Sequence, residues 1–122
     1  VVSAHDPQPP EDKRLPIAEA AYGAAGLETL LPALMRLVAE KQVSLLDALR
    51  PVTSGPADLL GLPQGRLAKG APADLIVFDP DAPWYCDRED LVSRSKNSPF
   101  DGRMLEGRVL RTLVDGVTVF ER

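Results

Sequence analysis

The residues best suited to chemistry lie near the start of the chain, in the run His5-Asp6-Pro7-Gln8 and in the acidic pair Glu11-Asp12. Imidazole and carboxylate side chains bind metal ions and carry protons in catalysis. A catalytic zinc site needs about three protein ligands and an open position. His5 is the only histidine and Cys86 the only cysteine. Without further information, a single His beside an Asp is more often a hydrogen-bonded loop residue than a metal ligand.

Two other kinds of site find only partial support in the sequence. One histidine could serve a nucleophilic serine, but no serine stands in the strand–turn–helix elbow that exposes such a nucleophile. The run Gly23-Ala24-Ala25-Gly26 precedes a helical pattern and could direct backbone N–H groups at an anion. It lacks the full dinucleotide-binding pattern, so chain reversal is the favoured interpretation of these glycines.

A short strand, a long loop and a helix are predicted around the His5–Gln8 run. Val1–Ser3 has the composition of a β-strand, and a polar, proline-rich loop follows from Ala4 to about Ala25. A loop of that length in a compact domain is usually functional. Apolar residues then recur at i, i+3, i+4 and i+7 from Leu27 to Val38, which predicts an amphipathic helix.

Two shorter helices are predicted next, followed by a change to β patterns. Ser44 is the predicted N-cap of a helix that ends at about Val52, and a third helix runs from Ser54 or Gly55 to near Gly61. Strands are predicted over residues 75–78, 84–86, 109–114 and 117–120.

Turn residues separate these predicted strands. Asp79-Pro80 is expected to end the first of them, because proline cannot donate a hydrogen bond to a sheet. Asp115-Gly116 lies between runs of β-branched residues and predicts a tight hairpin. The first half of the chain is therefore expected to be helical and the second half to be β-structure.

The composition is that of a soluble globular protein. The 122 residues are 44% apolar and 26% charged, with a net charge of −4 and both signs interspersed. This balance argues against a nucleic-acid or anionic-membrane surface, and no apolar run approaches the roughly 18 residues of a membrane span. Cys86 cannot form an internal disulfide, which fits a cytoplasmic location, and it is expected to be a small buried apolar residue.

Several short motifs are specific when taken together. They are Ser3-Ala4-His5-Asp6-Pro7-Gln8, Glu11-Asp12-Lys13, Tyr22-Gly23, Gly26-Leu27-Glu28-Thr29, Ala73-Asp74-Leu75-Ile76-Val77, Ser95-Lys96-Asn97-Ser98-Pro99-Phe100 and Gly107-Arg108-Val109. This set resembles the C-terminal part of class I dihydroorotases, which are zinc-dependent amidohydrolases. The resemblance extends over essentially the whole chain.

The resemblance implies an α/β fold: the C-terminal fragment of a (β/α)8 metal-dependent amidohydrolase barrel and part of the adjoining β-sandwich. A complete barrel takes about 250 residues, so the chain holds at most a fraction of one. We expect residues 1–62 to be the last βα unit and terminal helices of the barrel, and residues 63–122 to be sandwich strands. The implied reaction is the reversible interconversion of N-carbamoyl-L-aspartate and dihydroorotate in pyrimidine biosynthesis. Most of the zinc ligands are expected upstream of this chain.

The resemblance also assigns site residues, and it departs from the family at one of them. The family run is Asp-His-Ala-Pro-His, and gapless alignment puts Ala4 where its proton-shuttling aspartate stands. Asp6 is the candidate replacement as catalytic residue and metal ligand, and His5 is a weaker metal-ligand candidate. Gln8 takes the place of a substrate-contacting histidine, and Tyr22-Gly23 matches a substrate-contacting backbone pair.

Two interpretations of the missing aspartate stay open. In the first, Asp6 faces the same side as Ala4 in an extended segment and replaces it, so the parent is an active dihydroorotase. In the second, the protein is a non-catalytic dihydroorotase-like partner of aspartate transcarbamoylase. Hydantoinase-type or allantoinase-type ring opening is a further alternative. We expect a homo-oligomer that acts on a small molecule, and an isolated chain that self-associates and neither binds zinc nor turns over dihydroorotate.

Overall fold

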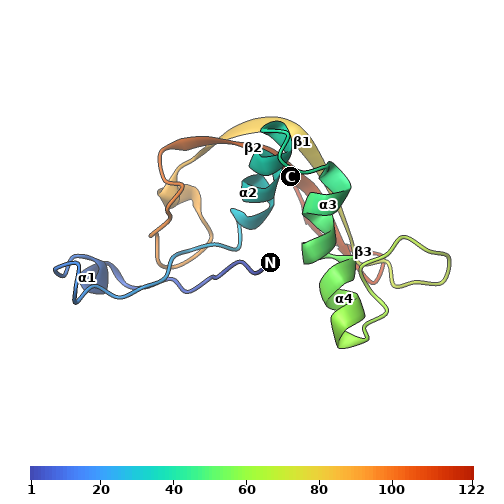
Figure 1. Cartoon of the computed structure of the whole chain (residues 1–122), viewed down its shortest axis with the longest axis horizontal. Coiled ribbons are helices and arrows are strands. Elements are labelled where there is room, and N and C mark those ends of the chain that lie inside the picture. The colour runs from blue at the N-terminus through green and yellow to red at the C-terminus, as the bar shows by residue number, and fades with distance from the viewer.

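The computed structural model describes residues 1–122, and its longest elements are two paired strands. β1 (Leu75–Cys86) and β2 (Arg103–Val114) are antiparallel. β2 pairs on its other side with β3 (Val117–Glu121), so the sheet order is β1-β2-β3. Figure 1 shows the β1–β2 ribbon as an arch, with the helix α2 (Leu30–Ala39) below it.

β1 is longer than the sequence predicts. The expectation that Asp79-Pro80 ends a strand is wrong, because β1 continues to Cys86 and includes both of the strands predicted separately. The register shifts between Val77 and Phe78 and again between Asp79 and Pro83. These bulges place Pro80, which has no N–H, at a point where β1 and β2 are not directly paired.

The predicted hairpin between β2 and β3 is confirmed. Val114 pairs with Val117 across a two-residue turn. Asp115 and Gly116 both have positive φ angles, 51° and 78°. A turn of this kind matches the right-handed twist of the strands, and Asp-Gly is among the sequences that adopt it most readily.

The amphipathic helix predicted from the leucine periodicity is α2 (Leu30–Ala39), which begins three residues later than Leu27. Leu34 and Met35 are buried on its inner face, whereas Leu27 precedes the helix and is 63% exposed. Met35 packs on β2 where Gly107 leaves room for it. A Cβ built at Gly107 would lie 2.6 Å from Met35 Cγ, so this glycine permits the close approach of helix and sheet.

The next three elements follow the predicted order: α3 (Leu45–Leu49), the 3₁₀ turn η1 (Arg50–Val52) and α4 (Ser54–Leu60). The N-cap at Ser44 is confirmed, since its Oγ accepts a hydrogen bond from the Asp47 amide at 3.2 Å. α4 ends at Gly61, whose left-handed backbone (φ 68°) closes the helix.

The amino-terminal segment differs from the prediction in two respects. Val1–Ser3 is not a strand, because its backbone has no partner strand, and the only bridge nearby joins His5 to Ala24. The following loop contains a one-turn helix, α1 (Pro10–Lys13). Lys13 Nζ donates to the Ala21 carbonyl at 2.7 Å and closes the loop on itself. Figure 1 shows α1 at the far end of this loop, away from the other helices.

The buried core consists of two small clusters. One contains Ala25, Cys86, Leu91 and Leu105, and the other contains Leu34, Met35 and Ala48. Beside them, side chains of α2, α3, β1 and β2 line an open, mostly apolar groove of about 900 Å³. None of the helices is long and apolar enough to cross a bilayer. The α/β class is confirmed, while the eight-stranded barrel and the division at residue 62 stay predictions.

Candidate functional site

Two loop segments that are far apart in the sequence lie side by side and hold most of the predicted site residues. His5 forms an isolated parallel bridge with Ala24. The Asp6 amide donates to the Ala24 carbonyl at 3.0 Å. The segment His5–Gln8 is thereby fixed against the segment Tyr22–Ala25, and the site is built across this pair.

Asp6 and Gln8 form the polar centre of this pair. Gln8 Nε2 donates to Asp6 Oδ1 at 2.9 Å, and the Asp6 side chain is exposed to solvent. Gly23 lies against Asp6 with a φ of 107°, a conformation that other residues rarely adopt. A Cβ at Gly23 would overlap the Asp6 carbonyl and approach Asp6 Oδ2 to 2.8 Å. Glycine at position 23 is therefore required for the observed contact.

The backbone of Ala4 is unusual. Its φ angle is 47°, in the left-handed region where alanine is uncommon and where Asp and Asn are better tolerated. The alternation of an extended strand is broken at this residue. Residues 4 and 6 therefore need not face the same side of this backbone, and Asp6 itself is exposed to solvent.

His5 is held by the backbone before α2. Its Nδ1 accepts hydrogen bonds from the amides of Gly26 at 3.2 Å and Leu27 at 3.4 Å. In a neutral imidazole, an accepting Nδ1 leaves the proton on Nε2, so neither nitrogen offers a lone pair to a metal in this arrangement. The contacts favour a structural role for His5. The Gly26 amide, which the sequence suggested as a donor to a bound anion, donates to His5 instead.

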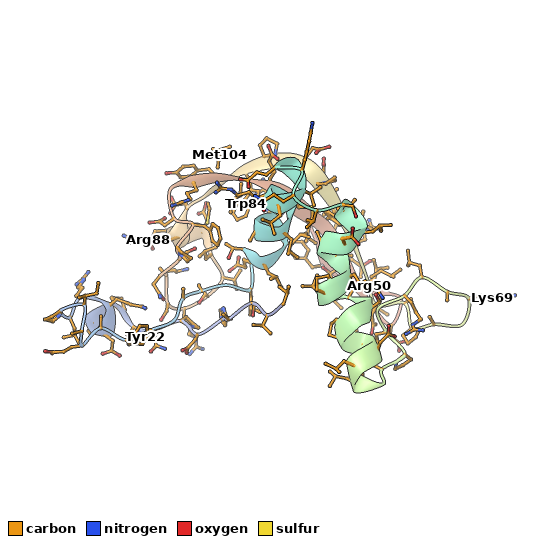
Figure 2. The ribbon with its side chains drawn as sticks, viewed as in Figure 1. Tyr22, Arg50, Lys69, Trp84, Arg88 and Met104 are labelled. Carbon is orange, nitrogen blue, oxygen red and sulfur yellow. The ribbon has the colours of Figure 1, made fainter.

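Tyr22 lies at the edge of the site with its side chain 90% exposed. Figure 2 shows it on the projecting loop, far from Trp84 and Arg50. None of the hydrogen bonds within the chain uses the Tyr22 amide, the Tyr22 carbonyl or the Gly23 amide. The Gly23 backbone lies against Asp6, and Tyr22 precedes it in the chain.

Asn97 is a site residue that the sequence patterns did not indicate. Its Oδ1 accepts from the Gln8 amide at 3.3 Å, and its Nδ2 donates to the Gly23 carbonyl at 2.9 Å. Its own carbonyl accepts from the Ala25 amide at 2.8 Å. Asn97 lies within a motif already noted for its resemblance to the family, but nothing in its spacing indicated contact with residues more than 70 positions away.

The fold changes the ionisation of one nearby side chain. Burial raises the pKa of the Cys86 thiol, the hydrogen bond with Ser98 lowers it, and the charge of Asp101 adds to the increase. Cys86 is fully buried under the loop that carries Asn97. The prediction of a small buried apolar residue is confirmed, and the thiol is not available for chemistry at neutral pH.

The chain does not form a metal site by itself. No group of three or more His, Cys, Asp and Glu side chains lies close enough together to hold a metal ion. Asp6 is the only carboxylate at the site, and His5 is bound to backbone amides. What these residues can supply is a carboxylate that accepts or donates a proton and neighbouring backbone groups that bind a polar substrate.

Comparison with known proteins gives a consistent assignment. Residues 1–120 match the Amidohydrolase family. The chain is 45% identical over 120 residues to a dihydroorotase of Anaplasma phagocytophilum (strain HZ), covering 98% of this chain and 27% of that protein. It is 42% identical over 122 residues to a dihydroorotase of Wolbachia sp. subsp. Drosophila simulans (strain wRi), covering 100% and 28%. The chain thus spans little more than a quarter of the length of these curated relatives.

Solved structures give the same fold. The L-hydantoinase (dihydropyrimidinase) from Arthrobacter aurescens matches with a TM-score of 0.80 and 35% identity, over 86% of this chain and 24% of that one. The D-hydantoinase (dihydropyrimidinase) from Thermus sp. matches with a TM-score of 0.85 over 96% and 27%. Its identity of 22% supports the fold alone.

Proposed function

This chain belongs to the amidohydrolase family, and we propose that it is the C-terminal part of a cyclic amidohydrolase that interconverts N-carbamoyl-L-aspartate and dihydroorotate. The observation that carries this proposal is the contact of the Gly23 backbone with Asp6, together with Tyr22 and Gly23 amides that no other group of the chain uses. The identities of 45% and 42% to two dihydroorotases favour dihydroorotate over other cyclic amides.

Asp6 is proposed as the residue that moves the proton. Ring opening adds the oxygen of water to the ring carbonyl and breaks the C–N bond, so one proton must leave the attacking oxygen and one must reach the departing nitrogen. A carboxylate can accept the first proton and return it to the nitrogen. Gln8 keeps Asp6 oriented through its 2.9 Å hydrogen bond.

Tyr22, Gly23 and Gln8 are proposed to bind the substrate. The amides of Tyr22 and Gly23 can donate hydrogen bonds to the substrate carboxylate or ring carbonyl, since no other group in the chain uses them. Gln8 Nε2 donates to Asp6 Oδ1 at 2.9 Å and to the Asp6 carbonyl at 3.4 Å, and the longer of these two bonds can be exchanged for one to the substrate. The zinc of the family, which polarises the carbonyl when bound, would need ligands from residues other than these 122.

A second candidate function is favoured by Ala4. The resemblance places a proton-shuttling aspartate at this position, and the left-handed backbone observed there suits Asp better than Ala. If Asp6 does not replace it, the protein is a non-catalytic relative that supports an assembly with aspartate transcarbamoylase. The similarity to an L-hydantoinase keeps hydantoin-type ring opening as a third candidate function.

Replacement of Asp6 in the full-length protein distinguishes these functions. Asp6→Asn keeps the size and the contact to Gln8 but cannot carry the proton, so we expect kcat for dihydroorotate to fall by about 10²–10⁴-fold. The matched control is Glu11→Gln, since Glu11 is an exposed acid of the same loop whose side chain makes no hydrogen bond. Its activity should be unchanged.

Each other outcome selects a different function. If the wild-type protein does not turn over dihydroorotate but stimulates aspartate transcarbamoylase, the non-catalytic assembly role is supported. Turnover of hydantoin in place of dihydroorotate supports the third candidate function. An Asp6→Asn protein with full activity removes Asp6 from the mechanism.

A further inference from the structure

Asn97 connects the two segments of the site with both ends of its side-chain amide. The oxygen accepts from the Gln8 amide at 3.3 Å, and the nitrogen donates to the Gly23 carbonyl at 2.9 Å. A side-chain amide combines one acceptor and one donor group in a single plane, which a carboxylate or a hydroxyl of similar size does not. The type of residue at this position therefore matches the two groups it joins.

The link made by Asn97 complements the direct contacts between the segments. The Asp6 amide reaches the Ala24 carbonyl at 3.0 Å, which aligns the segments at that point. Gln8 lies two residues beyond this contact, and its backbone makes no hydrogen bond to the Tyr22–Ala25 segment. Asn97 thus determines how far Gln8 lies from Gly23, and both are proposed substrate-binding residues.

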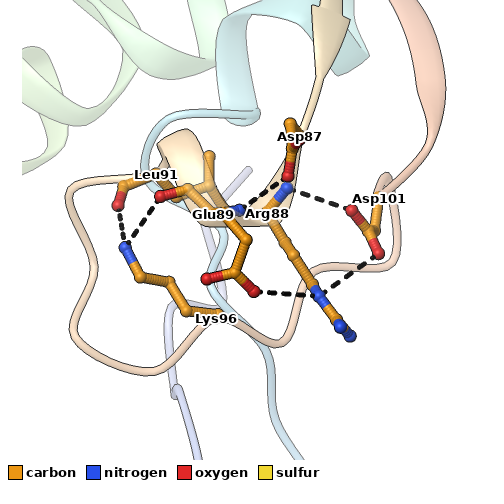
Figure 3. Close-up of polar contacts among 6 residues, drawn as sticks. All are labelled: Asp87, Arg88, Glu89, Leu91, Lys96 and Asp101. Atoms are coloured by element: carbon orange, nitrogen blue, oxygen red, sulfur yellow. Dashed lines mark hydrogen bonds and ion pairs between the residues drawn. The ribbon is translucent and has the colours of Figure 1, made fainter.

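The loop that carries Asn97 is braced independently of the site, as Figure 3 shows. Lys96 Nζ donates to the carbonyls of Glu89, at 3.3 Å, and Leu91. Arg88 donates from its backbone amide to Asp101 Oδ1 at 3.0 Å. These contacts close the loop between β1 and β2, so Asn97 is presented from a loop that is anchored to the sheet.

We propose that Asn97 is a positioning residue that sets the spacing of the substrate-binding groups on Gln8 and Gly23. This role rests on the proposed function, and Asn97 acts through these two residues without touching the reacting atoms. The Asp6 backbone is held by the Ala24 carbonyl independently of Asn97, so loss of Asn97 affects substrate binding more than proton transfer.

The variant Asn97→Asp tests the donor end of the amide in the full-length protein. It retains an acceptor for the Gln8 amide and puts a carboxylate against the Gly23 carbonyl. We expect KM for dihydroorotate to rise by about tenfold, with kcat changed less than about threefold.

Two further variants separate positioning from general damage. Arg94→Ala is the matched control, because Arg94 is exposed on the same loop and makes no hydrogen bond or ion pair, and its KM should equal that of wild type. In Asn97→Ala, hydrogen–deuterium exchange should accelerate in peptides covering residues 5–9 and 22–26, and not in Arg94→Ala.

The proposal is overturned if Asn97→Asp and Arg94→Ala have the same KM, or if kcat of Asn97→Asp falls as much as its KM rises. If the wild-type protein does not turn over dihydroorotate, the proposed function fails and the exchange measurement alone decides the positioning role. Unchanged exchange in Asn97→Ala would then refute it.

Discussion

Cys86 links the packing around the site to a measurable pH dependence. Burial raises the pKa of its thiol above the ordinary value of 9.0, so the folded protein holds this proton more tightly than the unfolded chain does. The stabilisation is complete below the unfolded pKa and is lost as the pH rises through the folded one. We therefore predict that the free energy of unfolding falls from about pH 9 upward.

The measurement compares the wild-type protein with Cys86→Ala in urea at several pH values. Other groups also titrate in this range, so the comparison is between the two proteins in how steeply the free energy of unfolding changes with pH. The variant should be less stable at neutral pH, because it leaves a small cavity beside Leu105, but it should lose stability less steeply above pH 9. Equal slopes would show that the thiol does not ionise on unfolding.

At the same residue scale, the sequence identified the site in part. The residue types drew attention to the run His5–Gln8, and the family resemblance supplied the roles of Asp6, Gln8 and Gly23, two of which the structure brings into contact with Asp6. Asn97 could not be found in this way, because its partners lie 89 and 74 residues away in the chain. The binding of His5 Nδ1 by backbone amides likewise depends on tertiary structure.

At the scale of elements, Gly107 controls how closely α2 packs on β2. It is buried with a φ of 89°, and an added Cβ would lie 2.6 Å from Met35 Cγ. We predict that Gly107→Ala lowers the free energy of unfolding by about 1–3 kcal/mol more than backbone strain alone, because the helix must move away from the sheet.

Gly70→Ala is the matched control for this prediction. Gly70 has nearly the same φ, 85°, but nothing lies within 4 Å of the position that an added Cβ would take, so the substitution costs about 1–2 kcal/mol of strain only. Urea denaturation of both variants gives the comparison. Similar losses of stability at the two positions would mean that Met35 adjusts without cost and that the contact does not set the packing distance.

Local patterns predicted the elements well wherever the chemistry was local. Ser44 caps α3 and Asp115-Gly116 forms the hairpin, because each outcome depends on a few neighbouring residues. The predicted end of β1 at Asp79-Pro80 is wrong, because β1 remains paired with β2 on both sides of these residues and bulges accommodate them. Val1–Ser3 has the composition of a strand but forms none, because a strand needs a partner strand and the structure places none beside these residues.

At the scale of the whole molecule, the chain leaves much apolar surface uncovered. The groove of about 900 Å³ is lined by side chains of α2, α3, β1 and β2, and Leu46 on α3 is 78% exposed within it. Contiguous apolar surface of this kind is characteristic of an interface. We therefore predict that the isolated 122-residue chain self-associates, with a sedimentation coefficient that increases with protein concentration.

Two charge substitutions identify the surface responsible. Leu46→Glu introduces a charge into the groove and should shift the chain toward monomer. Val92→Glu adds the same charge at a residue that is 88% exposed but lies outside the groove, and it should leave self-association unchanged. A monodisperse wild-type monomer would contradict the prediction outright. Equal effects of the two substitutions would indicate that net charge, rather than the groove, governs association, because both variants add one negative charge to the net of −4.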